Sequence, residues 1–228
     1  MSREAILGAI RRGLRRGPLP EDQMIGLRAR LAAHPRHLIP ARSRTARPEQ
    51  VLLFIRNVEK EYGSVVRVPE AGVVPGAVAD YLATQNLPSA FAMAPHPELQ
   101  ALPWGERPML QPREGIAVAS DLVTVQHGFA GIAETGTLML PGGPQRPTTL
   151  NLLADTAIVV LRASRIVGAY EEAFDLVRAE GTGLLPRNIM LVTGPSRSAD
   201  IESTLELGAH GPRRLHIVLI DDDSSALD

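Results

Sequence analysis

A single carboxylate, Glu134, lies between small residues in the segment Gly131–Leu138, directly before an expected strand. Two glycines of this segment relax the steric limits on the backbone, so amides can approach a group that Glu134 holds. A carboxylate in this setting could be a catalytic nucleophile, with the nearby amides stabilising a developing oxyanion. The alternative is a structural turn, in which the side chains of Glu134 and Thr135 bond only to nearby backbone amides. On the catalytic interpretation, the ligand-binding neighbours are Thr135, Gly136 and Thr137.

A second candidate is the segment Thr193–Glu202, which follows an expected strand and leads into an expected helix near 199–207. Free amides at a helix N-terminus attract anions, and the Arg197 guanidinium adds a planar donor group. A well-capped helix without a ligand is the alternative, with Ser196 or Ser198 as the cap and acids in the first turn. On the binding interpretation, the ligand-binding residues are Gly194, Ser196, Arg197 and Asp200.

Three further residues could bind a ligand or transfer a proton. His127 follows an expected strand and shares a loop with Glu134, and Arg146 lies in a glycine- and proline-rich turn where it could meet a carboxylate or phosphate. That turn also suits a simple connection between a strand and a helix. His210 lies near glycines and should be exposed, but its loop enters a strand, which predicts a place on the rim opposite Ser196. No histidine has metal-ligand spacing to another histidine or acid, so no metal site is expected.

The elements that would position these residues alternate between strands and helices. The run 156–161 is apolar without alternation, which is typical of a strand buried on both faces. Such an order predicts an α/β fold of three layers, a mostly parallel sheet with helices on both faces. Ligands bind at the carboxyl ends of strands in such sheets, so the loops after three of these strands should share one rim. Helices are expected near 2–16, 21–33, 48–62, 75–85, 147–153 and 169–179, and strands near 64–68, 89–93, 116–119, 121–126, 137–140, 156–161, 188–192 and 215–220.

Composition narrows the classes of protein. Residues 1–47 are expected to form a helical extension before an α/β domain over 48–228, and the first 60 residues carry 13 basic against 5 acidic side chains. This excess suits either an acidic partner or a solvated helical face. Aromatic residues make up only 4%, which argues against nucleic-acid binding. With no cysteine the chain has no thiolate ligands for an iron-sulfur cluster, so no cofactor is expected in it. No apolar run approaches the roughly 18 residues of a membrane span, so we expect a cytoplasmic protein without a membrane anchor.

Four segments taken together resemble the lactate utilization protein C family, whose members carry a LUD domain. The resemblance covers about residues 50–221 and implies a fold similar to the sugar-isomerase and coenzyme A transferase superfamily. Any one of the segments alone would be weak, whereas four in this order are specific. The segments are Gly131–Leu138, Leu185–Ile189, Thr193–Glu202 and Gly208–Pro212.

The resemblance also implies a function. It suggests a non-redox component of a system that oxidises L-lactate to pyruvate, with iron-sulfur proteins as partners and a small carboxylate or phosphate-like anion as ligand. The missing cysteine agrees with that division of labour. A free-standing acyl- or coenzyme A transferase-like enzyme with Glu134 as nucleophile is the alternative. A pure interaction protein, in which the basic N-terminal helices dock an acidic partner, is a third possibility.

Overall fold

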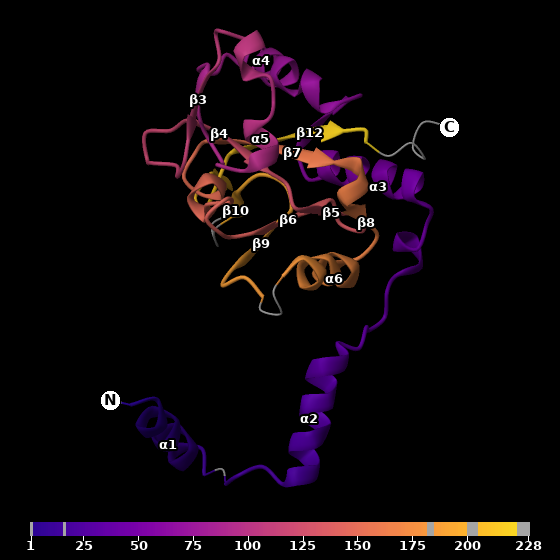
Figure 1. Ribbon diagram of the computed structural model, residues 1–228, viewed down its shortest axis with the longest axis vertical. Helices are drawn as coiled ribbons and strands as arrows, with labels where there is room; N and C mark the ends of the chain where they lie inside the picture. The colour runs from indigo at the N-terminus through magenta and orange to yellow at the C-terminus, as the bar shows by residue number, and fades with distance from the viewer. Residues whose placement is uncertain (1, 16, 182–184, 200–204, 223–228) are drawn as a thin grey trace. The chain divides into compact units, whose positions relative to one another are not determined.

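The computed structural model describes residues 2–15, 17–181, 185–199 and 205–222 (Figure 1). The chain divides into two compact units, Met1–Leu38 and Ile39–Asp228. The sequence analysis placed the end of the helical extension later, at residue 47. The helix that begins at residue 47 belongs to the second unit, because its apolar side chains enter that unit's core.

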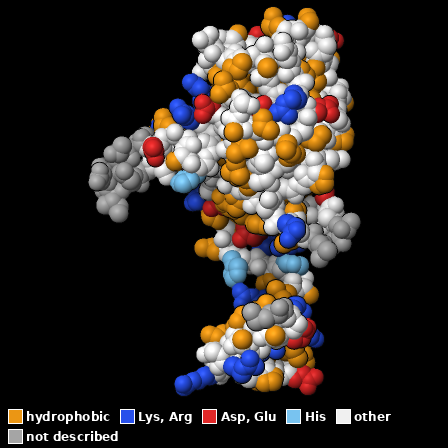
Figure 2. Space-filling model, turned by 90° about the vertical axis from the view of Figure 1, so that its left-hand side faces the viewer, with side chains coloured by type: hydrophobic (Ala, Val, Ile, Leu, Met, Phe, Trp, Pro, Cys, Tyr) orange, Lys and Arg blue, Asp and Glu red, His pale blue; other side chains and the backbone are white. Residues whose placement is uncertain are grey.

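The N-terminal unit consists of two helices, α1 (Arg3–Gly13) and α2 (Glu21–Ala33). Ser2 caps α1, since its hydroxyl accepts a hydrogen bond from the Ala5 amide at 3.3 Å. No residue of either helix is buried, and Figure 2 shows hydrophobic side chains of this unit beside Lys and Arg side chains. Both helices therefore match the expected positions, with their apolar side chains exposed. Among the described residues, no helix has the length and apolar character required to cross a membrane.

A parallel sheet of six strands forms the centre of the second unit, in the order β1-β12-β7-β4-β2-β3. Every pair of neighbouring strands in it is parallel. Side chains of β7 alternate between two hydrophobic clusters, so this strand is buried on both faces as its apolar run predicts. The strands are β1 (Ser64–Val68), β2 (Ala90–Met93), β3 (Gln111–Glu114), β4 (Val123–His127), β7 (Thr156–Arg162) and β12 (Arg214–Ile220).

Different elements cover the two faces of this sheet. The α4 helix (Val74–Thr84) packs on one face, and α3 (Arg47–Lys60) packs on the other together with a second sheet. The α6 helix (Tyr170–Glu180) packs on the outer side of that second sheet. The expected α/β class with helices on both faces is confirmed. The remaining short helices are α5 (Pro97–Gln100), η1 (Ala41–Ser43), η2 (Ala71–Val73), η3 (Trp104–Glu106), η4 (Thr148–Asn151) and η5 (Ala163–Arg165).

The second sheet was not expected from the sequence. It has four strands in the order β8-β5-β6-β9, namely β8 (Ile166–Val167), β5 (Ala130–Ile132), β6 (Thr137–Pro141) and β9 (Ile189–Val192). The β9 strand is not part of the central sheet, and the loop after it bonds to Pro212, which lies just before the start of β12, so this loop does not lie at the carboxyl ends of the central strands. The expectation that all three candidate loops share one rim is therefore wrong for the loop that starts at Thr193.

Two expected elements are also wrong. The helix near 199–207 is absent from the described part of that segment, because β10 (Arg197–Ala199) pairs antiparallel with β11 (Leu205–Leu207). The Ser196 amide, expected near a helix start, donates to the Pro212 carbonyl oxygen at 2.8 Å. The strand near 116–119 is a turn instead, in which the Asp121 carboxylate accepts a hydrogen bond from the Val118 amide at 2.7 Å.

Candidate functional site

The turn that carries Glu134 is held against the α3 helix. The Asn57 side-chain amide donates to the carbonyl oxygens of Ala133 and Glu134, at 2.8 and 3.1 Å. Gly136 has a φ of +66°, and a Cβ atom added to it would lie 2.5 Å from the Val58 backbone nitrogen. A glycine is therefore required here by its conformation and by the closeness of the helix. Packing alone accounts for this glycine, which the sequence analysis assigned to ligand binding.

The Glu134 carboxylate, our expected nucleophile, meets a cation of its own unit. Its Oε1 lies 3.1 Å from the Arg42 Nη2, and its side chain is 13% exposed. Glu134 lines neither of the two cavities described below. The carboxylate thus has an ion-pair partner within its own unit.

A test separates the structural from the catalytic interpretation of Glu134. Because Arg42 is 63% exposed, the pair should contribute no more than about 1 kcal/mol to the free energy of unfolding. We expect Glu134→Gln and Arg42→Gln to have similar small effects in urea unfolding, and the double variant to add little to either. A covalent adduct on Glu134 after treatment with acyl thioesters and hydroxylamine would contradict the structural interpretation.

The two threonines that follow Glu134 belong to a network of hydroxyl groups. The Thr137 hydroxyl lies 2.7 Å from that of Thr135, 3.0 Å from that of Tyr170 and 2.6 Å from that of Thr193. This network joins the Glu134 turn to the start of the Ser196 loop, so the two predicted loops do meet. Its hydroxyl groups bond to one another, which leaves them little capacity for a ligand.

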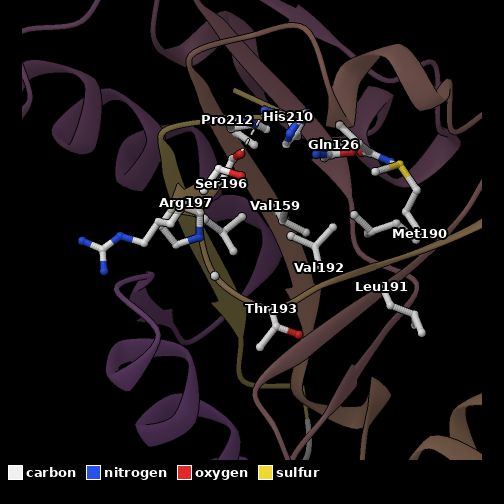
Figure 3. Close-up of a pocket in the computed structure, with 18 residues that line it drawn as sticks. Gln126, Val159, Met190, Leu191, Val192, Thr193, Ser196, Arg197, His210 and Pro212 are labelled. Atoms are coloured by element: carbon white, nitrogen blue, oxygen red, sulfur yellow. Dashed lines mark hydrogen bonds between the residues drawn. The ribbon is translucent and has the colours of Figure 1, made fainter. Parts of the chain in front are cut away.

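The Ser196 loop borders a cavity of about 300 Å³ between the two sheets, which we call the inter-sheet pocket (Figure 3). Gly194, Ser196, Arg197 and His210 all line it. The Arg197 guanidinium, however, extends away from the cavity and lies 3.5 Å from the centre of the Tyr62 ring. The structure therefore brings these four predicted residues together but does not aim the expected cation at a ligand.

Three details of this loop bear on the sequence predictions. Gly194 has a φ of +73° and faces the Glu61 carbonyl oxygen so closely that a Cβ atom would overlap it. His210 is not on the opposite rim, because its amide donates to the Ser196 hydroxyl at 3.2 Å. The expected separation of these two residues is wrong, since β11 pairs with β10 and the residues after β11 lie beside Ser196. Asp200 lies outside the described residues.

A second cavity of about 330 Å³, the rim pocket, lies at the carboxyl ends of three adjacent central strands. His127 is the last residue of β4, Arg162 is the last residue of β7, and His96 follows β2 as the N-cap of α5. This edge is where ligands bind in open parallel sheets. The cavity is lined by His96, Glu98, His127, Gln145, Arg146, Arg162, Arg165 and Glu180.

Arg146 contacts a ring nitrogen of each of two histidines in the rim pocket. Its Nε donates to the His127 Nδ1 at 3.2 Å, and its Nη2 lies 3.1 Å from the His96 Nε2. The two rings are stacked with their centroids 3.7 Å apart. His96 is only 7% exposed and His127 only 8%. Two residues that the sequence analysis treated as separate possibilities, His127 and Arg146, are therefore direct partners.

Both rings are neutral at neutral pH. Burial and the charges nearby lower the pKa of His127 to about 3, and burial followed by the Arg146 charge lowers the pKa of His96. The amide of Glu98 donates to the His96 Nδ1 at 3.3 Å, which places the proton of this ring on Nε2. The Nε2 proton then faces the Arg146 Nη2, which is also a donor. Two donors 3.1 Å apart are satisfied when an anionic oxygen lies beside both.

The other two arginines of the rim pocket already have carboxylate partners. Arg162 donates to the Glu98 Oε2 at 2.6 Å, and the Arg165 Nη1 lies 2.7 Å from the Glu180 Oε1. Within the described part of the chain, Arg146 forms no ion pair, and burial lowers its pKa from the ordinary value. Since both histidines are neutral, the lining residues carry one excess positive charge, which lies on Arg146, while Arg162 is also paired with Asp222 outside the lining at 3.5 Å.

The distances alone would also allow a metal ion here. Ligand atoms of His96, Glu98 and His127 all lie within 4.8 Å of one another. A cation would have to displace the Arg146 guanidinium, which lies 3.1 to 3.2 Å from a nitrogen of each ring. Two imidazole rings stacked face to face also cannot both aim a lone pair at one ion. The arrangement therefore favours an anion over a metal.

The sequence analysis missed His96 and Glu98. Both follow an expected strand near 89–93, so the rule that ligands bind after the strands of a parallel sheet could have found them. Their closeness to Arg146 depends on a contact between segments about 50 residues apart, which sequence spacing does not show.

Comparison with known proteins decides the family. The model of the LUD domain family matches residues 51–220, most of the chain. This protein belongs to the LUD domain family. The LUD domain thus contains both cavities and the Glu134 turn.

Similar proteins agree with this assignment. An uncharacterized protein of Neisseria meningitidis is 41% identical over 103 residues, which cover 43% of this chain and 44% of that protein. Lactate utilization protein C of Bacillus subtilis is 37% identical over 94 residues, which cover 40% of this chain and 39% of that protein. The Macrococcus caseolyticus protein of the same name is 37% identical over 93 residues, which cover 40% of this chain and 40% of that protein. The matched stretches thus span less than half of these relatives.

A solved structure supports the fold. The crystal structure of a DUF162 family protein from Deinococcus radiodurans covers 77% of this chain and 99% of its own, with a TM-score of 0.58. Because the two sequences are only 20% identical, this similarity bears on the fold alone.

Proposed function

We propose that this LUD-domain protein is a non-redox component of an iron-sulfur-dependent system that oxidises L-lactate to pyruvate, and that it binds a small carboxylate in the rim pocket. Relatives from several bacteria carry the name lactate utilization protein C, which supports the role in lactate use. The chain has no cysteine, so thiolate-bound clusters would belong to its partners. The iron-sulfur partners and the carboxylate are parts of this proposal.

The pair of opposed donors on Arg146 and His96 is the observation that carries the binding site. A carboxylate beside the Arg146 Nη2 and the His96 Nε2 would accept from both and would neutralise the excess positive charge of the pocket. His127 fixes the other side of the guanidinium through its Nδ1. Because both rings are neutral, the charge that selects an anion comes from the arginine alone.

A pull-down from lactate-grown cells tests the role in the system. With the full chain as bait, we expect both the wild type and Arg146→Met to recover iron-sulfur proteins, because the rim pocket binds a ligand and does not have to bind the partner. The assembly recovered with Arg146→Met should oxidise L-lactate at least ten-fold more slowly with an artificial electron acceptor. Failure of the wild-type bait to recover iron-sulfur proteins would contradict the proposed system. Equal rates for the two assemblies would contradict a role of the rim pocket.

A further inference from the structure

The inter-sheet pocket has a chemistry different from that of the rim pocket. Its walls are apolar on two opposite sides (Figure 3). The six-stranded sheet contributes Ala157, Val159 and Leu215, and the four-stranded sheet contributes Leu140 and Val192. Two sheets that face each other in this way enclose a flat space, which suits a planar group with apolar faces. The volume of about 300 Å³ is at the lower end of the range of roughly 300 to 1,000 Å³ for small-molecule sites.

Two side-chain amides lie buried at this pocket without adequate partners. Gln126 and Asn151 are 5% and 7% exposed. The Asn151 Oδ1 has no hydrogen-bond partner among the described residues, and the Asn151 Nδ2 has only the Met190 sulfur at 3.4 Å. The Gln126 side chain forms no hydrogen bond to another described residue, and it lines the cavity. A buried amide without a hydrogen bond is costly, so a ligand that supplies the missing bonds would explain why both are there.

No charged group is aimed into the pocket from the residues that the structure describes. Arg197 is the charged member of the lining, and its guanidinium lies over the Tyr62 ring instead. At the mouth, Ser196 is tied to the neighbouring loop, since its hydroxyl accepts from the His210 amide and its own amide donates to Pro212. The interior therefore presents amide groups between apolar walls, which favours a neutral ligand over an anion.

We propose that the inter-sheet pocket binds a neutral planar heterocycle that carries a lactam edge, an N–H donor next to a C=O acceptor. An amide side chain offers a donor and an acceptor side by side, so it pairs with such an edge through two parallel hydrogen bonds. Gln126 and Asn151 are the recognising residues, and the two sheets hold the faces of the ring. Gln126 and His127 are consecutive residues of β4, so their side chains point to opposite faces of the sheet and serve different pockets.

Binding of small lactams to the full chain tests this site. The probes are hypoxanthine and lumichrome, measured by titration calorimetry or ligand-observed NMR, each beside an analogue methylated at the lactam nitrogen. We expect the methylated analogues, and the Gln126→Leu variant with either probe, to bind at least ten-fold more weakly than the matching wild-type complex. An Asn151→Ala variant should weaken binding in the same direction.

A stability measurement keeps the test independent of folding. Because the Gln126 amide gives up no hydrogen bond to a described residue, Gln126→Leu should be at least as stable as the wild type in urea. Absence of binding of both probes to the wild type at millimolar concentration, or equal binding by Gln126→Leu, would overturn the proposal. The site does not depend on the proposed function, and Arg146→Met should bind the probes as the wild type does.

Discussion

Replacing Gly136 with alanine should lower the free energy of unfolding of the second unit by roughly 2 to 5 kcal/mol. Two effects add here. The φ of +66° is unfavourable for alanine, and the new Cβ atom would lie 2.5 Å from the Val58 backbone nitrogen in the last turn of α3. The nearest atoms are backbone atoms of Val58 and Asn57 and the Asn57 Cβ, so no flexible side-chain end can move aside. Urea unfolding followed by the fluorescence of Trp104, the single tryptophan of the chain, reports on this unit directly.

Gly143→Ala is the matched control for this experiment. Gly143 has no positive φ, and a Cβ atom there would meet nothing within 4 Å, so its replacement should change stability by no more than about 0.5 kcal/mol. Equal stability of the two variants would show that the packing of Gly136 against α3 does not matter. If Gly136→Ala were stable and also lost carboxylate binding, the glycine would have the ligand role that the sequence suggested.

The hydrophobic pattern of the central strands was enough to predict the class of fold. The apolar run 156–161 has no alternation because both faces of β7 are buried. This run can be seen within a single segment of the sequence, so it is enough to predict a buried strand. The four-stranded sheet was missed because β5 and β8 have only three and two residues and pair with partners distant in the chain. The paired strands β10 and β11 were taken for part of a helix, because turn residues such as serine and aspartate also suit helix starts.

The sequence predicted only some of the residues of the rim pocket, namely His127 and Arg146. Conspicuous glycines drew attention to Gly136 and Gly194, yet both are required by close contact with α3. The two residues that would contact the carboxylate, His96 and Arg146, are in ordinary loops that only the folded sheet brings together. Sequence spacing finds residues that act within one segment, whereas this pocket depends on contacts between distant segments.

Arg146 is the residue whose replacement should affect carboxylate binding most. Its guanidinium has no carboxylate partner in the described part of the chain, so it is the group left to pair with a ligand. Loss of a charge-assisted hydrogen bond should weaken binding of L-lactate and pyruvate by about ten- to hundred-fold in Arg146→Met. Arg146→Lys should recover part of the affinity, because it keeps the charge but loses the planar fork.

The pH dependence of binding follows from the histidines. With the pKa of His127 at about 3 and that of His96 lowered, neither ring gains a proton between pH 8 and pH 7. The affinity should therefore stay constant in that interval. A steep rise in affinity as the pH falls would mean that a histidine, and not Arg146, supplies the charge.

Titration calorimetry of the full chain with L-lactate and with pyruvate tests the central claim most directly. Wild type, Arg146→Met and Arg113→Met are compared, since Arg113 pairs with Asp121 and lines neither pocket. Our account predicts saturable binding of at least one of the two carboxylates by the wild type and by Arg113→Met, and a loss of at least ten-fold for Arg146→Met. The absence of binding by the wild type, or equal affinities for all three proteins, would contradict it.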